Sequence, residues 1–421
     1  MLLHIHNNMV EASHHSQSDN MTTAGTILAQ FTSRFFQKHI KVSAFVNNLF
    51  LARYSSNMAT KLLDIDTPVI PLNEGKRFIV DCMVAVGTPK NHADALANLL
   101  IEADYRGHYS HGMNRLEIYV NDINAGVCDA RASPTILKES PATAWVDGNN
   151  GLGAVVGNFC MDLAMKKAKE VGIGWVSCKG SNHYGIAGMY SLQAINNGLL
   201  GMSFTNTSPF MAPTRSKEAV LGTNPISLGA PAKDGDSFVL DMATTAVAVG
   251  KVEIQRRKNE PIPEGWALGP SGSTITDAQM ACDNGCLMPL GGKEINSGYK
   301  GFGLGMLVEI FCGILGGSTY GPNIRKWGNT SRVADLGQCF IAIDPNCFAP
   351  GFEIRMSDLM NYIRNLTPAE VDKPVLVAGD PERLHMEAVD KFGGVRYLPN
   401  QHESCNRLSK ELNVKPLVAL K

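Results

Sequence analysis

The sequence lacks the signatures of several common protein classes. It has no basic excess, with 38 Lys and Arg against 39 Asp and Glu, which argues against nucleic-acid binding. It contains no GxxxxGK[ST] loop and no GxSxG turn, so neither a P-loop NTPase nor a nucleophile-elbow hydrolase is expected. The ten cysteines form no CxxC pair, which argues against a metal site and indicates reduced, mostly buried thiols.

A run long enough to span a membrane is also missing. The most apolar window, residues 301–317, contains Glu309 and several glycines. It is shorter than the roughly 20 apolar residues that a membrane span needs. We therefore expect a buried helix of a soluble protein here and no membrane partner.

The first 70 residues differ from the rest of the chain. Residues 20–63 contain no Asp or Glu but carry Arg34 and Arg53 among Ser, Thr and apolar residues. Acid-poor segments of this kind are typical of mitochondrial transit peptides. We predict an N-terminal extension over residues 1–70, either a transit peptide or an unstructured tail. A start at Met58 would remove the signal, so the expected location is mitochondrial or cytoplasmic.

From about Val69 onward, helical and extended patterns alternate, which is typical of an α/β protein. Helices are expected within 73–89 and 91–107, with Asn91 as N-cap and Gly107 as stop, and a third within 109–126. If the third helix begins near His111, then His111 and Arg115 share one face. Strands or further helices are expected within 134–153, 157–172, 173–181, 191–209, 237–244, 342–366 and 385–399.

Two stretches carry candidate chemistry. YSHGMNR places Ser110 and His111 near Arg115, and GSNHYGIAGMYS places His183 before small residues at a predicted helix start. Histidine exchanges protons near neutral pH, and the arginine fork binds both oxygens of a carboxylate. A buried histidine bonded to a carbonyl group is the alternative for His183. We do not expect adjacent Ser110 and His111 to point their side chains at each other.

A glycine-rich stretch, GNNGLGAVVG at residues 148–157, precedes a predicted helix. Its spacing is GxGxxxG instead of the GxGxxG of a Rossmann dinucleotide site. A glycine turn before a helix is the preferred interpretation, and a Rossmann fold is not supported.

Six motifs, in the order YSHGMNR, GSNHYGIAGMY, LGTNPIS, FVLDMAT, PIPEGWAL and GYKGFGL, resemble the malate/L-lactate dehydrogenase family of the second type. This family includes sulfolactate and ureidoglycolate dehydrogenases and Δ1-piperideine-2-carboxylate reductases. The resemblance, from about Pro71 to Pro416, implies an α/β, sulfolactate-dehydrogenase-like, non-Rossmann fold. It implies a mixed-sheet NAD(P)-binding domain over 181–361, a discontinuous and mainly helical substrate domain over 71–180 and 362–421, and a homodimer.

The resemblance also implies hydride transfer between NAD or NADP and a small 2-hydroxy or 2-oxo acid of the malate or lactate type. His111, with Ser110 beside it, and His183 are alternative proton carriers, and His111 is favoured because it lies near Arg115. Arg115 and Thr223 are the implied substrate contacts. The implied cofactor contacts are His183, Tyr184, Gly185, Ile186, Ala187, Thr207, Asp241, Met242, Ala243, Tyr299, Lys300, Gly379, Asp380, Pro381 and Glu382.

Two other functions are weighed against this one. The first is NADPH-dependent reduction of cyclic imino acids of the Δ1-piperideine-2-carboxylate type. Imine-reducing members have an aspartate where this chain has Lys251, which argues against it. The second is a catalytically silent dinucleotide-binding protein, which would require the loss of His111, His183 or Arg115, although all three are present.

Overall fold

The computed structural model describes residues 67–420. The predicted transit peptide and the alternative start at Met58 lie outside the described residues. Within residues 67–420, no helix combines the length and apolar character needed to cross a bilayer. All ten cysteines are free thiols and seven of them are buried, as predicted.

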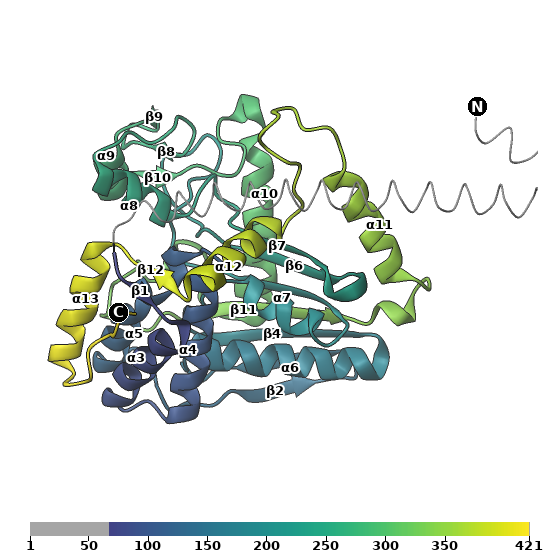
Figure 1. Cartoon of the computed structure of the whole chain (residues 1–421), viewed down its shortest axis with the longest axis horizontal. Coiled ribbons are helices and arrows are strands. Elements are labelled where there is room, and N and C mark those ends of the chain that lie inside the picture. Colours follow the sequence, from purple (N-terminus) through teal and green to yellow (C-terminus); the bar gives the residue numbers. More distant parts are fainter. Residues whose placement is uncertain (1–66, 421) are drawn as a thin grey trace, which may run out of the picture. The chain divides into compact units, whose positions relative to one another are not determined.

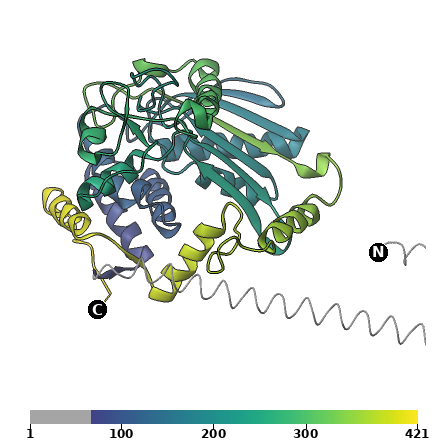
Figure 2. The same ribbon diagram turned by 90° about the horizontal axis from the view of Figure 1, so that it is seen from above.

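Helices from both ends of the described chain pack together (Figures 1 and 2). A short antiparallel pair ties these ends, and Arg77 donates hydrogen bonds to the carbonyl oxygens of Lys415 and Pro416. The elements of this region are β1 (Val69–Ile70), α3 (Leu72–Ala85), α4 (Lys90–Tyr105), α5 (Leu116–Asn124), α12 (Asp380–Phe392), β12 (Val395–Arg396) and α13 (Pro399–Glu411).

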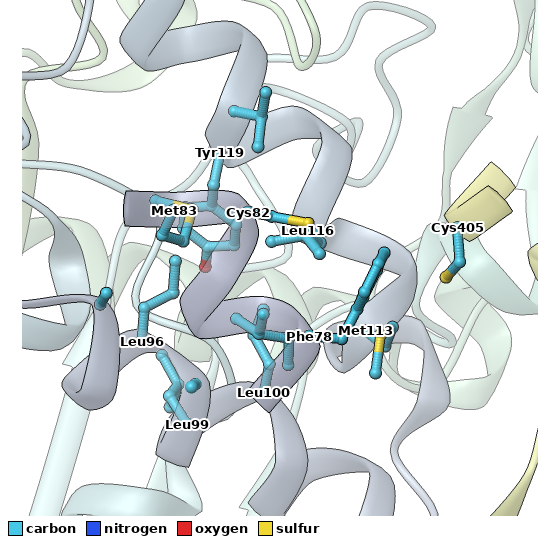
Figure 3. Packing of buried hydrophobic residues seen from close by; sticks show 14 of the residues in the cluster. Phe78, Cys82, Met83, Leu96, Leu99, Leu100, Met113, Leu116, Tyr119 and Cys405 are labelled. Atoms are coloured by element: carbon cyan, nitrogen blue, oxygen red, sulfur yellow. The ribbon is translucent and has the colours of Figure 1, made fainter. Parts of the chain in front are cut away.

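An apolar core joins these helices to the segment just before and within α5. Figure 3 shows Met113, Leu116 and Tyr119 of that segment among side chains of α3 and α4. Each fully buried side chain of this size stabilises the fold by about 1.5–3 kcal/mol. The packed side chains include Phe78, Cys82, Met83, Leu96, Leu99, Leu100, Met113, Leu116, Tyr119 and Cys405.

A mixed seven-stranded sheet, as predicted, forms the second part of the described chain. Its order is β2–β3–β4–β11–β5–β6–β7, with β3 and β4 parallel and the other neighbours antiparallel. The strands are β2 (Thr135–Glu139), β3 (Thr143–Asp147), β4 (Ile173–Ser181), β5 (Leu200–Thr205), β6 (Ile226–Pro231), β7 (Ser237–Met242) and β11 (Leu336–Ile343). Strands on both sides of residue 181 share the sheet, and the division into domains stays a prediction.

Helices cover both faces of this sheet. Alternate residues of the central strand β11 point to opposite faces and pack against different helices. Phe340 and Ala342 pack in the cluster formed with α6 (Gly153–Val171) and α7 (Gly188–Ile195). Cys339 and Ile341 pack in another cluster, with side chains of α10 (Gly298–Glu309) and the π-helical turn Ile310–Ile314.

A smaller unit carries the residues between β7 and α10. Its three-stranded sheet has the order β10–β8–β9, and helix α11 lies separately, after β11. The remaining elements are α8 (Val249–Lys258), β8 (Ala267–Leu268), β9 (Thr274–Ile275), α9 (Ala278–Asn284), β10 (Cys286–Leu287) and α11 (Phe352–Arg364).

Three local predictions were wrong. The residue before α4 is Pro89, so Asn91 lies inside the helix instead of capping it, whereas Gly107 does follow its end with φ of 84°. The predicted helix over 109–126 is interrupted at Gly112, whose ψ of −141° separates the 3₁₀ turn Tyr109–His111 from the turn Met113–Arg115, which leads directly into α5. The window 301–317 is helical but not wholly buried, because one apolar face is exposed to solvent.

We expect Gly301→Ala to destabilise the protein, because helix α10 packs directly on the backbone of Leu290. A Cβ at Gly301 would lie 2.3 Å from the Leu290 carbonyl oxygen, and overpacking of this kind costs about 1–3 kcal/mol. Gly303, in the same helix, has open space around its Cβ position. Gly303→Ala is therefore the control, expected to be neutral or stabilising by about 0.5–1 kcal/mol. Chemical denaturation measures both, and equal stabilities would contradict the packing argument.

Candidate active site

A cavity of about 500 Å³ lies where the helical region meets the sheet. It is lined by the turn around residues 108–115, the loop 183–187 after β4, the segment 241–251 that ends β7 and begins α8, and Trp327. A larger surface hollow of about 800 Å³ lies at residues 212–218 and 288–294. It contains no histidine, and its arginine, Arg215, is paired with Glu294, so the smaller cavity is the better candidate.

The turn that carries Ser110, His111 and Arg115 is built around a buried carboxyl group. Asp104 Oδ2 accepts hydrogen bonds from the Met113 amide at 2.9 Å and from the Tyr397 hydroxyl at 2.8 Å. A Cβ at Gly112 would lie 1.8 Å from Asp104 Oδ1, so glycine is required where the backbone passes this carboxyl. Burial raises the pKa of Asp104 to about 7.

Ser110 and His111 do point at each other, contrary to the sequence-based prediction. Ser110 Oγ and His111 Nδ1 are 2.8 Å apart, and both residues belong to the 3₁₀ turn Tyr109–His111. Arg115 Nε donates to the Ser110 carbonyl oxygen at 2.5 Å. Desolvation lowers the pKa of His111 to about 3, and the Arg115 charge adds to this effect. The free protein therefore holds a neutral imidazole beside a guanidinium group.

His183 lines the same cavity, from the loop that follows β4. Its ring stacks on that of His111, with centroids 5.7 Å apart and planes inclined by 19°. Its Nδ1 lies 2.6 Å from the Tyr119 hydroxyl of helix α5, so the partner of this ring nitrogen is a hydroxyl and not the carbonyl group of the alternative considered from the sequence. Burial, His111 and Arg115 all lower the pKa of His183 well below its usual value.

A half-buried acid, Asp241, also lines the cavity. Asp241 Oδ2 accepts a hydrogen bond from the Gly188 amide at 2.7 Å, at the start of α7. Desolvation raises the pKa of Asp241 to about 6, although His108 opposes the shift. His108 Nε2 lies 3.5 Å from a carboxylate oxygen of Glu382, which belongs to the first turn of α12. These contacts join the end of the sheet to α7, and the 108–115 turn to α12.

The structure brings most of the sequence-predicted site residues together. Six predicted cofactor contacts lie away from the cavity lining: Tyr299 and Lys300 are on α10, and residues 379–382 lie around the start of α12. Asp380 is bound by Arg364 and Arg383, and Glu382 approaches the cavity only through His108. The predicted residues that line it are Ser110, His111, Arg115, His183, Tyr184, Gly185, Ile186, Ala187, Thr207, Thr223, Asp241, Met242 and Ala243.

Several cavity residues were not found from the sequence. His108 and Trp327 line the cavity, and Tyr119 orients His183 from behind it. His108 lies two residues before Ser110, a position that gave a usable signal. Trp327 and Tyr119 gave none, because their partners are distant in the chain. Among residues 67–420, no cluster of His, Cys, Asp and Glu has the arrangement of a metal site.

Comparisons with known proteins agree with this architecture. The family model for malate/L-lactate dehydrogenase matches residues 70–404. The malate dehydrogenase of Pyrococcus abyssi is 40% identical over 351 residues, which are 83% of this chain and 96% of that protein. The solved structure of malate dehydrogenase from Pyrococcus horikoshii OT3 has a TM-score of 0.77 at 37% identity, covering 84% of this chain and 98% of that one. This likeness confirms the predicted fold class.

A relative with imine-reducing activity in its name is less similar. The Δ1-pyrroline-2-carboxylate reductase of Ancylobacter novellus is 34% identical over 289 residues, which are 68% of this chain and 83% of that protein. The greater similarity to the malate dehydrogenases favours the first of the functions considered from the sequence.

Replacing Asp104 by asparagine is expected to change how stability depends on pH. The pKa of about 7 in the folded state lies above the ordinary 3.8, so the folded protein binds this proton more tightly than the unfolded chain does. The contribution is therefore full below about pH 4 and is lost as the pH rises to about 7, by on the order of 4 kcal/mol at most. The uncharged amide of the Asp104→Asn variant has no proton to release, so the stability of this variant has no such dependence on pH.

Urea denaturation across that pH range measures the effect. We expect Asp104→Asn to gain stability relative to the wild type as the pH rises. Asp94→Asn, on the same helix but partly exposed and paired with Lys90, is the control and should follow the wild-type pH profile. Parallel profiles for Asp104→Asn and the wild type would contradict the assignment of a raised pKa to the buried Asp104 carboxyl group.

Proposed function

Because this chain belongs to the malate/L-lactate dehydrogenase family, it is an oxidoreductase that transfers a hydride between NAD(P) and a small 2-hydroxy or 2-oxo acid, and we propose that malate and oxaloacetate are its substrate pair. The observation that carries the proposal is the placement of Arg115 and two neutral imidazoles on one cavity. A second cation, Lys251, lines the same cavity and suits the second carboxylate of a dicarboxylic acid.

The cavity fits a nicotinamide ring together with a small acid. Small and apolar residues such as Ile186, Ala187 and Ala248 offer flat contact area, and a few hydroxyl groups, including those of Thr207 and Thr223, offer directional bonds. The bound cofactor supplies or accepts the hydride at C4 of its nicotinamide. The protein has to hold the acid, orient it and exchange a proton with its oxygen at C2.

We assign substrate binding to Arg115 and proton exchange to the histidine pair. The guanidinium fork binds the carboxylate next to C2. Hydroxyl groups occupy Nδ1 of both rings, Ser110 on His111 and Tyr119 on His183, so Nε2 of each ring is the atom that exchanges a proton. His111 is the favoured proton carrier, because a carboxylate on Arg115 would offset the charge that helps to lower its pKa.

Variants at Arg115, His111 and His183 test these roles. With oxaloacetate and either NADH or NADPH, Arg115→Lys should raise KM about tenfold or more, because an ammonium group cannot bind both carboxylate oxygens. His111→Ala should lower kcat by roughly 100- to 10,000-fold, the usual contribution of acid–base catalysis. His183→Ala should raise the cofactor Kd more than it lowers kcat.

Absorbance at the reduced-cofactor band follows turnover, and Arg131→Lys, a surface change, is the control. Pyruvate and Δ1-piperideine-2-carboxylate are assayed in parallel. Faster turnover of the imine would favour the alternative reductase, and preference for pyruvate would indicate a lactate-type enzyme. Turnover of none of these compounds with either cofactor would overturn the proposal.

We also propose that the chain forms a homodimer through the exposed face of α10 and the following turn. This face presents Met306, Leu307, Ile310, Ile314 and Leu315, with Ile310 47% and Ile314 54% exposed. Apolar side chains one helical turn apart form a continuous stripe. Exposed stripes of this kind mark protein interfaces more often than free surface.

Ile314→Glu is expected to convert the dimer into a monomer at micromolar concentration, because it places a charge at the centre of an apolar contact. Val84→Glu, on helix α3 with 46% of the side chain exposed, is the matched control and should leave the oligomeric state unchanged. Sedimentation velocity measures both. A monomeric wild-type protein, or an Ile314→Glu variant that remains dimeric, would contradict the proposed interface.

A further inference from the structure

We propose that Trp327 determines substrate specificity: its indole ring forms the wall of the cavity that holds Arg115 in position and limits the size of the acid. This inference rests on the proposed function, because it concerns the same cavity and the same acid. Neither the six sequence motifs nor the histidine pair includes this residue, which lies between the turn 321–323 and strand β11.

The indole contacts the arginine assigned to the acid and one of the two cavity histidines. The Arg115 Cζ atom lies 5.4 Å from the centre of the Trp327 ring, within the range of a cation–π interaction. The ring centroid of His183 lies 5.1 Å from the same indole. Arg115 is therefore held by the Ser110 carbonyl oxygen at Nε and by the indole at the guanidinium group, which fixes the direction of the fork.

A buried ion pair anchors the segment that carries Trp327. Arg325 donates two hydrogen bonds to the carboxylate of Asp122, and both side chains are about nine-tenths buried. The Arg325 guanidinium group also donates to the carbonyl oxygen of Asn329 at 3.0 Å. The Arg325 carbonyl oxygen in turn accepts a bond from the hydroxyl of Ser208, a residue of the cavity lining.

This anchor implies that the indole is a rigid wall and not a surface side chain that moves aside. Separating a buried ion pair leaves an uncompensated buried charge, so the segment is strongly held where Arg325 meets Asp122. Trp327 is two residues from Arg325 and is only partly exposed. The space between the indole, Arg115 and His183 is therefore fixed, and an acid has to fit within it.

Trp327→Ala and Trp327→Phe test the inference through relative rates. In the full-length protein we measure kcat and KM for oxaloacetate and for the bulkier phenylpyruvate. Trp327→Ala should raise the kcat/KM ratio of phenylpyruvate to oxaloacetate at least tenfold, mainly because KM for oxaloacetate rises. Trp327→Phe should lie between Trp327→Ala and the wild type, since a smaller ring keeps part of the wall. The cofactor Kd should change by a smaller factor than KM for oxaloacetate, because Trp327 reaches the cofactor side only through His183.

Lys326→Ala is the matched control, because Lys326 is an exposed neighbour in the same segment and does not line the cavity. It should keep the wild-type ratio. A ratio that stays within twofold of the wild type in Trp327→Ala would overturn the inference. A Lys326→Ala variant that shifts the ratio as much as Trp327→Ala would also overturn it, because the effect would then belong to the segment.

The Kd of oxamate, measured by isothermal titration calorimetry on the protein saturated with NADH or NADPH, tests this inference separately from the proposed function. If the wild type turns over no acid, the proposed function fails, but the oxamate measurement still decides the role of Trp327. A Kd at least tenfold weaker in Trp327→Ala supports the inference, and an unchanged Kd overturns it. If Trp327→Ala does not fold, as judged by its melting temperature, the same measurements on Trp327→Phe decide, with a weakening of about threefold or more as the supporting result.

Discussion

A carboxyl group buried beneath the 108–115 turn is the constraint on which the active site depends. Asp104 holds the Met113 amide, and Gly112 passes so close that a side chain has no room. Because the turn cannot relax away from this contact, Ser110, His111 and Arg115 are presented to the cavity in one arrangement. The apolar packing of Met113 and Leu116 in the core below fixes the same segment from its other side.

Helix α5 extends this constraint to parts of the chain that are distant in sequence. Arg115 directly precedes the helix, the Tyr119 hydroxyl reaches His183, and Asp122 binds Arg325 of the segment that carries Trp327. Three positions, each about one turn from the next, therefore set three sides of the cavity. An error in the placement of α5 would displace the carboxylate clamp, the second imidazole and the indole wall together.

The sequence predicted the elements and motifs well, because hydrophobic periodicity and glycine turns are local signals. Strand β4 was found in this way, whereas the mixed sheet and a site shared by Arg115, His111 and His183 were implied by the family resemblance. The break at Gly112 was missed, because the need for glycine there arises from Asp104, a tertiary contact. The Ser110–His111 contact was missed as well, because it depends on the side-chain rotamers of a short turn. Trp327 and the Asp122–Arg325 pair were missed because nothing in their local sequence indicates partners roughly 200 residues away.

The charges of the site explain why clamp and proton carrier are neighbours. In the free protein, burial and the Arg115 charge together keep His111 neutral. A carboxylate on the guanidinium group opposes the second of these effects and makes protonation of the imidazole easier. By linkage, a protonated His111 binds the anion more tightly by the same factor. Binding of the anion and binding of the proton therefore strengthen each other. This coupling suits the reduction of a 2-oxo acid, because each hydride delivered to carbon is matched by one proton delivered to oxygen.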